Sequence, residues 1–457
     1  MEQDKSGAPF RHPIDWRSEG FYDRAALDAE SRRIFDVCHG CRRCFNLCDS
    51  FPRLFELIDE SKTGELDSVE SKGFARVVEA CTLCDMCFMV KCPYVPPHEF
   101  NIDFPHLMLR HRALALREGQ LGFAERRLAE TEANGRLARH LAPLANWATR
   151  KSNRPTRTLL RWLAGIHPDA RLPRYESRTF LARAREEAIA VNTKAPAFGR
   201  KAALFATCFL NYNDTAIGEA ARRVLAHNGI ETEVFFPACC GMPKLEQGDL
   251  KTTASRARTI AGAALAYVDK GYAIIAPVPS CALMMKFEWP LILPEDDAVK
   301  RLADQVFDLS EYVVDIARNE GLAPGLKPLP GGITAQVPCH ERAQNMGAKS
   351  AEMLRLIPET ELAVIERCSG HGGTFGVKAA THEVAVRVGK PVARQALERA
   401  SAYVASACPL AAGHLVEGMD KLESEPGRGP APPRAGRAHH PIELMALSYG
   451  FGDEAAP

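Results

Sequence analysis

The sequence lacks the features that mark membrane-spanning, secreted and nucleic-acid-binding proteins. No run approaches 18 consecutive apolar residues, so no membrane-spanning helix is expected. The chain starts MEQDKSGAPFRHP, without an apolar segment, so no secretory signal is expected either. The formal net charge is only +1, which gives no reason to expect nucleic acid as a partner. We therefore expect a cytoplasmic protein, peripheral on the inner face of the plasma membrane if it contacts a membrane at all.

Disulfide bonds are also not expected, although cysteine is abundant. The chain has 457 residues, enough for two to four domains, and its 46% hydrophobic and 25% charged residues are typical of globular proteins. It contains 15 cysteines, an odd number. A reducing compartment disfavours structural disulfides, so metal binding or redox chemistry is the expected use of these thiols.

Eight cysteines lie between residues 38 and 92 in two similar runs. The runs read C-x2-C-x2-C-x3-C from Cys38 and C-x2-C-x2-C-x4-C-P from Cys81. Three cysteines at two-residue gaps let one tight loop present three thiolates to a cluster, and in two-cluster ferredoxins the fourth cysteine of each run completes the other cluster. We therefore predict two [4Fe–4S] clusters. Their ligands are Cys38, Cys41, Cys44 and Cys92 for the first, and Cys81, Cys84, Cys87 and Cys48 for the second.

Zinc is the alternative for these eight thiols. Structural zinc usually takes separated Cys-x2-Cys pairs and does not need a third cysteine at the same spacing. The runs depart from the ferredoxin pattern in two places, because a gap of four precedes Cys92 and Asp49 rather than proline follows Cys48. Neither departure removes a ligand. Helical patterns at 24–37 and 74–80 flank the runs, which predicts an α-helical ferredoxin domain over residues 1–104.

The segment that separates the two groups of cysteines is basic. Residues 105–178 contain 15 Arg or Lys against 6 Asp or Glu in a helical pattern, with Trp147 and Trp162 among the arginines. One interpretation is a surface that docks on anionic lipid or on an acidic redox partner. The other is a set of solvated helix faces that cover a neighbouring domain. We treat residues 105–198 as a basic helical connector that ends at a Pro- and Gly-containing boundary.

From residue 199 onward, short β-like runs alternate with helical patterns. The six runs are 202–206, 231–236, 272–277, 333–337, 362–366 and 403–406, and a cysteine follows each within a few residues. Such alternation predicts parallel sheets with helices packed on them. Sites in open α/β sheets collect at the carboxyl ends of the strands, so the seven remaining cysteines are expected to converge there.

The cysteines of this second half form a repeat. Cys208, Cys239-Cys240-Gly241 and Cys281 of the first copy correspond to Cys339, Cys368-Ser369-Gly370 and Ala411 of the second, in which Cys408 precedes Ala411 by three residues. The repeat predicts two similar α/β lobes, residues 199–325 and 326–423. With the preceding ferredoxin-type runs, this arrangement resembles the iron–sulfur proteins of the heterodisulfide reductase type, which carry cysteine-rich (CCG) domains. Residues 366–376, ERCSGHGGTFG, and the single Cys281 are most similar to one member of this family, a component of anaerobic glycerol-3-phosphate dehydrogenase.

The expected fold class is therefore α+β multidomain: an α-helical two-cluster ferredoxin domain followed by two duplicated α/β cysteine-rich (CCG) lobes. The resemblance implies a non-cubane [4Fe–4S] cluster, which a complete motif holds with five cysteines. The first lobe keeps four of them, and we expect one further cluster there, held by Cys208, Cys239, Cys240 and Cys281. The second lobe keeps only three, Cys339, Cys368 and Cys408.

A cluster in the second lobe would need a further ligand, from Ser369, His340 or His371. The alternative is that its thiols are left from duplication and are buried as small apolar side chains. His371 and His414 themselves are interpreted as hydrogen-bonded structural residues. We therefore expect the first lobe to hold the functional cluster and the second to serve mainly as its structural partner.

The resemblance also implies a function. Clusters without an organic cofactor move single electrons, so hydride chemistry would belong to another protein. The expected function is an iron–sulfur electron-transfer subunit of an oxidoreductase complex, which passes electrons from a flavoprotein dehydrogenase or other redox protein to a quinone or other acceptor. It would be an oxidoreductase component rather than a stand-alone dehydrogenase, and no catalytic residue is assigned. The alternative is a heterodisulfide-reductase-like catalyst in which the CCG cluster reduces a disulfide or other small substrate.

The end of the chain differs in composition from the lobes. Residues 424–457 begin with a stretch rich in Pro, Gly and Arg, which predicts a linker, and continue as a C-terminal tail. Within this tail, residues 441–449 are predicted to form a short docking helix.

Overall fold

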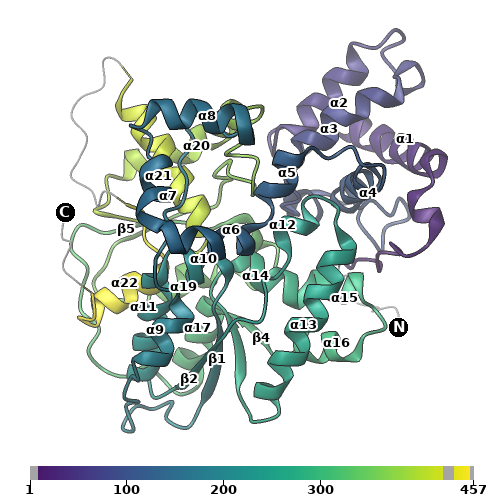
Figure 1. Cartoon of the computed structure of the whole chain (residues 1–457). Helices are drawn as coiled ribbons and strands as arrows, with labels where there is room; N and C mark the ends of the chain where they lie inside the picture. The colour runs from purple at the N-terminus through teal and green to yellow at the C-terminus, as the bar shows by residue number, and fades with distance from the viewer. Residues whose placement is uncertain (1–8, 426–436, 453–457) are drawn as a thin grey trace.

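Two parallel β-sheets organise the carboxyl-terminal half of the computed structural model, which describes residues 9–425 and 437–452 (Figure 1). The first sheet has the strand order β2-β1-β3-β4 and the second has β6-β5-β7, and all strand pairs are parallel. The strands are β1 (Lys201–Phe205), β2 (Glu231–Phe235), β3 (Ala273–Ala276), β4 (Val306–Asp308), β5 (Ile333–Gln336), β6 (Leu362–Ile365) and β7 (Tyr403–Ser406). The predicted combination of helices with parallel sheets is confirmed.

All six predicted β-like runs form strands, with each boundary within one residue of the prediction. The central strands β1 and β5 are buried almost throughout, as expected for parallel strands covered on both faces by helices. The structure adds β4, an edge strand of the first sheet that we did not predict. Its three residues are too few to show a periodic pattern, and no cysteine follows them.

The first lobe is built around the four-stranded sheet. The long helices α11 and α13 form where the sequence pattern predicts helices, at 215–227 and 252–269, and each buries one apolar face. The helices of this lobe are α10 (Cys208–Tyr212), α11 (Thr215–His227), α12 (Met242–Leu245), α13 (Leu250–Val268), α14 (Pro279–Leu283), α15 (Trp289–Ile292), α16 (Asp297–Ala303) and α17 (Leu309–Asn319).

The second lobe repeats the arrangement on the three-stranded sheet. Its helices are α18 (Cys339–Arg342), α19 (Lys349–Leu354), α20 (His382–Arg399) and α21 (Pro409–Glu423). The predicted C-terminal helix is α22 (Pro441–Ser448), which packs on α11 of the first lobe and on α19 of the second. It therefore holds the two lobes together. The predicted linker lies mostly outside the described residues.

The N-terminal region is helical, with α1 (Arg24–Cys41), α2 (Ser50–Asp59) and α3 (Ala75–Ala80), and shares one continuous hydrophobic core with the first lobe. A buried ion network strengthens this junction. The Arg11 guanidinium contacts the carboxylates of Asp85, Asp103 and Glu288 at 2.7, 3.1 and 3.0 Å. Glu288 belongs to the first lobe, so the N-terminal region and that lobe pack as one body.

The connector runs across both lobes. Its helices are α4 (Phe104–Arg117), α5 (Phe123–Leu128), α6 (Thr131–Ala138), α7 (Ala142–Ala148), α8 (Arg154–Ala164) and α9 (Phe180–Glu186). Helices α6 and α9 pack on α10 of the first lobe, whereas α8 lies beside the second lobe, where Ile166 pairs with Lys378 (Figure 1). Lys151 contacts the buried Glu417 of α21 at 2.9 Å.

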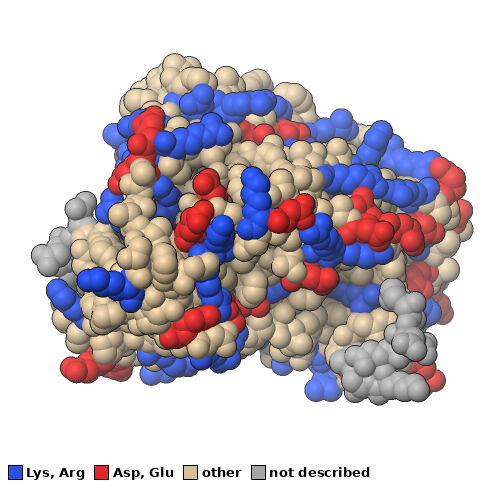
Figure 2. Space-filling model, turned by 90° about the horizontal axis from the view of Figure 1, so that it is seen from below, with Lys and Arg blue, Asp and Glu red and all other residues tan. Residues whose placement is uncertain are grey.

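No helix in the described part of the chain is long and apolar enough to cross a membrane. On the face seen from below in Figure 2, Lys and Arg side chains are interspersed with Asp and Glu.

Candidate iron–sulfur sites

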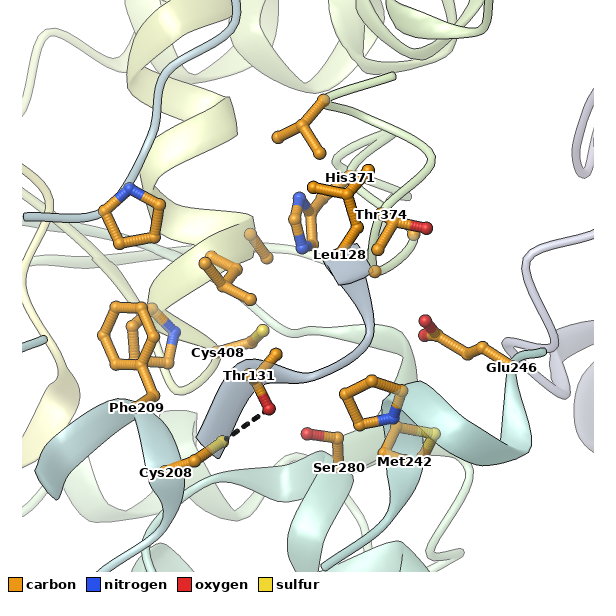
Figure 3. A pocket seen from close by; sticks show the side chains of 18 of the residues that line it. Leu128, Thr131, Cys208, Phe209, Met242, Glu246, Ser280, His371, Thr374 and Cys408 are labelled. Atoms are coloured by element: carbon orange, nitrogen blue, oxygen red, sulfur yellow. Dashed lines mark hydrogen bonds between the residues drawn. The ribbon is translucent and has the colours of Figure 1, made fainter. Parts of the chain in front are cut away.

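The carboxyl ends of both sheets face a single cavity of about 500 Å³ between the lobes (Figure 3). Each strand that is followed by a cysteine in the sequence ends beside this cavity, because parallel strands place their carboxyl ends at one edge of a sheet. All seven cysteines of the lobes line this cavity, and one ferredoxin-type cysteine joins them. They are Cys208, Cys239, Cys240, Cys281, Cys339, Cys368, Cys408 and Cys84.

The four thiols of the first lobe lie in two close pairs. The sulfur of Cys239 is 3.7 Å from that of Cys208, and the sulfur of Cys281 is 3.2 Å from that of Cys240. The fully buried Trp289 donates its indole N–H to the Cys240 carbonyl at 3.2 Å, which fixes the loop that carries the double cysteine. The structure thus brings together the set predicted from the sequence; that it binds a cluster stays a prediction.

Two residues of the connector complete this site, and no sequence pattern pointed to them. The Thr131 hydroxyl lies 3.5 Å from the sulfur of Cys208 and 3.6 Å from that of Cys239 (Figure 3). The Glu132 carboxylate accepts the backbone N–H of Cys239 at 2.9 Å. Thr131 precedes Cys208 by 77 positions, and a helical pattern alone does not show that α6 packs over the cysteines.

In the second lobe, backbone amides face the thiols. The N–H of Gly370 donates to the sulfur of Cys368 at 3.3 Å. Cys408 is the N-cap of α21. Burial raises the pKa of its thiol, and the backbone N–H groups of Ala411 and Leu410 at the start of the helix act against this shift. Burial likewise raises the pKa of Cys368, against the effect of the Gly370 N–H.

The structure brings together cysteines from both N-terminal runs. Cys38, Cys41, Cys44 and Cys92 line one small cavity. The other four, the group of Cys84, include Cys48 of the first run, whose pKa is raised by burial and then by the thiols of Cys84 and Cys81. The loop between Cys81 and Cys87 is tightly coiled, since Leu83 and Asp85 have left-handed φ values of 48° and 63°. That the cysteines bind iron in this pairing stays a prediction.

The surroundings of most of these thiols keep them protonated unless a metal binds. Burial is the main cause, and it raises the pKa of Cys44 to about 11 and that of Cys84 to about 12. Cys239 differs, because hydrogen bonds with the thiols of Cys208 and Cys240 lower its pKa. A metal ion or cluster supplies the positive charge that stabilises thiolates, so its binding would be coupled to proton release.

A buried carboxyl group faces the cavity from the first lobe. Glu246 follows α12, and its side chain points towards the cavity beside Gly373 (Figure 3). Burial raises its pKa to about 7, although the positive charges of Arg112 and Lys378 act against the shift. Sequence reasoning missed this residue, because one glutamate in a loop carries no distinguishing pattern.

The histidines near the second lobe differ from one another. Nδ1 of His414 lies 2.6 Å from the carbonyl oxygen of Ser369, which fits the structural role we predicted. His371 lines the cavity, and its buried Nε2 has no hydrogen-bond partner among the described residues (Figure 3). The same holds for Nε2 of His340, which follows Cys339.

Comparison with known proteins assigns the chain to a family. The family model described as "Cysteine-rich domain" (CCG) matches residues 202–286 and 333–415, one match for each lobe. One subunit of anaerobic glycerol-3-phosphate dehydrogenase from Escherichia coli (strain K12) is 30% identical over 284 residues, which cover 62% of this chain and 69% of that protein. Lactate utilization protein A of Geobacillus thermodenitrificans (strain NG80-2) is 32% identical over 193 residues, covering 39% of this chain and 75% of that protein. The two lobes are thus CCG domains, and the chain belongs to the family of CCG-domain proteins that includes this component of anaerobic glycerol-3-phosphate dehydrogenase.

Proposed function

We propose that the protein is the iron–sulfur electron-transfer subunit of an oxidoreductase, which takes electrons from a flavoprotein dehydrogenase and passes them to a quinone or another acceptor. This proposal rests on one observation, the series of three cysteine sites in the structure. The series starts at the surface group of Cys38, continues through the group of Cys84 and ends at the cavity between the lobes. When bound, iron–sulfur clusters supply one-electron steps at such sites.

The surface beside the first group suits the docking of the electron donor. Phe45 and Val90 are 52% and 49% exposed next to Cys44 and Cys92. The exposed cations Arg43 and Lys91 lie close enough to lower the pKa of Cys44 against the larger effect of burial. An apolar centre with a basic rim is complementary to an acidic redox partner. The donor is therefore proposed to bind here, away from the cavity.

The cavity supports a second candidate function, the reduction of a small substrate. It is large enough for a small organic molecule, and thiols from both lobes, His371 and Glu246 line it. A disulfide would enter this cavity and take up two electrons and two protons, which yields two thiols. Glu246, with its pKa near 7, lies where it can release a proton into the cavity.

One experiment separates these candidates. The full chain, purified and reconstituted anaerobically, is reduced with dithionite and then mixed with a quinone analogue or with a small organic disulfide. Faster reoxidation of the clusters by the quinone supports electron transfer to a quinone, whereas reoxidation only by the disulfide supports the catalyst. A cofactor-loaded protein that neither acceptor reoxidises would contradict both. Affinity capture of the native complex then identifies the donor, which we expect to contain flavin.

The connector provides the proposed membrane contact. Its surface combines exposed apolar side chains with arginines, as interfacial helices do. The exposed apolar residues are Phe123, Leu137, Leu141, Leu144, Trp147, Leu159, Trp162, Leu163 and Phe198. Several connector arginines serve other contacts, for example the fully buried Arg157, which donates to three backbone carbonyls of residues 167–170. Apolar contact, assisted by the remaining cations, is therefore the proposed basis of peripheral attachment.

Sedimentation with vesicles tests this attachment. Each basic residue near an anionic surface contributes about 1 kcal/mol, and salt screens this contribution. We expect the protein to sediment with anionic vesicles at low salt, and the double substitution Trp147→Ala, Trp162→Ala to weaken binding. Phe287→Ala, which removes an exposed aromatic side chain of the first lobe, is the control. Equal sedimentation of all three proteins would contradict a role for this surface.

A further inference from the structure

The second lobe has fewer cysteines than the first, but its thiols lie beside those of the N-terminal region. Cys339, Cys368 and Cys408 line the same cavity as Cys84 and the four cysteines of the first lobe. Burial raises the pKa of Cys339, and the nearby thiol of Cys84 raises it further. The three thiols of the second lobe therefore share one cavity with a thiol of the Cys84 group and with the site of the first lobe.

These thiols have unsatisfied imidazole nitrogens as neighbours. Nε2 of His340, His371 and His414 is buried and lacks a hydrogen-bond partner among the residues that the structure describes. Leaving a buried polar atom unpaired costs about 1–3 kcal/mol, so such atoms usually have a partner that completes the site. His414 is held at Nδ1 by Ser369 and is not part of the cavity lining, which leaves His340 and His371.

His371 is the better placed of the two to act as a ligand. His340 directly follows Cys339 at the start of α18, and neighbouring residues of a helix point in different directions. His371 follows Cys368 by three residues, in the turn where Gly370, Gly372 and Gly373 have positive φ angles, and its ring projects into the cavity (Figure 3). A neutral imidazole nitrogen is a good ligand for iron, and it replaces cysteine in some natural iron–sulfur centres.

We propose that the second lobe binds an iron–sulfur cluster through Cys339, Cys368 and Cys408, with Nε2 of His371 as the fourth ligand. All four side chains line the cavity between the lobes. The proposal rests on the proposed function for the chemistry of the cluster, and it gives this lobe a cluster beside the direct route from Cys84 to the first lobe, because all three sites line one cavity. It replaces our expectation that the second lobe is mainly structural.

The experiment measures iron, sulfide and nitrogen coordination in the full chain, reconstituted anaerobically with iron and sulfide. We expect Cys368→Ser to contain about four fewer iron atoms than the wild type, because one four-iron cluster is lost. Pulsed paramagnetic resonance of the reduced wild type should show the strong ¹⁴N coupling of a coordinated imidazole. His371→Cys should retain the iron, because a thiolate replaces the imidazole, but lose this coupling. The matched control His414→Asn should keep both.

Two results would overturn the proposal. One is an unchanged iron content in correctly folded Cys368→Ser, and the other is a ¹⁴N coupling that persists in His371→Cys. If Cys368→Ser does not fold, the comparison of His371→Cys with His414→Asn still decides the question. A wild-type protein that takes up no iron would refute the proposed function as well, whereas iron uptake that is indifferent to Cys368 and His371 would refute only this inference.

Discussion

The two CCG lobes share a repeat but differ in how they could hold a cluster. The first lobe keeps four cysteines in two close pairs, supports them with Thr131 and Trp289, and shares its core with the N-terminal region. The second keeps three cysteines, has its own smaller cores and surrounds its thiols with backbone amides and unpaired imidazoles. Yet the thiols of the second lobe line the same cavity as Cys84 and the cysteines of the first lobe. The number of cysteines alone therefore does not show how a lobe participates in electron transfer.

The largest expected difference between the lobes is in electron transfer to the acceptor. Cys240→Ser removes a ligand at the proposed exit site, because a serine hydroxyl is a much poorer iron ligand than a thiolate near neutral pH. We expect it to abolish reoxidation by the acceptor while both N-terminal clusters remain reducible by dithionite. Cys368→Ser should slow transfer less, since Cys84 itself lines the cavity and leaves a direct route. Stopped-flow absorbance measures both rates, and an equal loss in the two variants would contradict the order of sites.

The ligand assignment of the two predicted N-terminal clusters, which are proposed to pass electrons to the lobes, can be tested because each cluster takes one ligand from the other run. Cys92→Ala should damage the cluster of Cys38, although Cys92 belongs to the other run, and Cys48→Ala should damage the cluster of Cys81. Paramagnetic resonance spectra of the variants, compared with those of Cys38→Ala and Cys81→Ala, decide between the pairings. A Cys92→Ala spectrum that matches Cys81→Ala would refute the crossing.

The equivalent glycines of the repeat provide a test of packing. Gly241 and Gly370 both have left-handed φ angles, 90° and 80°. A Cβ atom at Gly241 would meet Thr253 at 3.4 Å, an ordinary contact, but at Gly370 it would lie 2.0 Å from the carbonyl oxygen of Ala385 in α20. We expect Gly241→Ala to lower the free energy of unfolding by about 1–2 kcal/mol through backbone strain. Gly370→Ala should lower it by about 3 kcal/mol or more, because α20 must also move. Anaerobic thermal unfolding measures both, and equal shifts would contradict the tighter packing of the second lobe.

The smallest predicted effect concerns the carboxyl group between the lobes. Burial raises the pKa of Glu246 from 4.5 in the unfolded chain to about 7, and the groups facing it are Arg112, Lys378 and Cys408. Because the folded state favours the protonated form, stability is lost as the pH rises from about 4.5 through 7. Glu246→Gln should remove this loss and be more stable than the wild type by roughly 2 kcal/mol at pH 8, but not at pH 4.5.

Unfolding midpoints at the two pH values measure this effect. The exposed Glu79→Gln is the matched control, and its midpoint should follow that of the wild type. A difference between Glu246→Gln and the wild type that is the same at both pH values would contradict the assigned titration.

Much of the lobe architecture could be predicted from the sequence, because strand periodicity and the repeat of cysteines are local signals. The strand at 403–406 and the helix at 215–227 have the predicted bounds. The strand β4 was missed, since three residues carry no period. The contacts of Thr131 and Glu246 with the cavity were also missed. Both depend on packing between segments far apart in the sequence, and so does the position of Cys84 beside the second lobe.

The central claim is that these cysteines hold a series of iron–sulfur clusters, and metal analysis tests it most directly. The full chain is purified anaerobically, and its iron, acid-labile sulfide and zinc are determined per polypeptide. Four clusters of the four-iron type predict about 16 iron atoms with a matching amount of sulfide, and three predict about 12. Tightly bound zinc with negligible iron and sulfide would contradict the account.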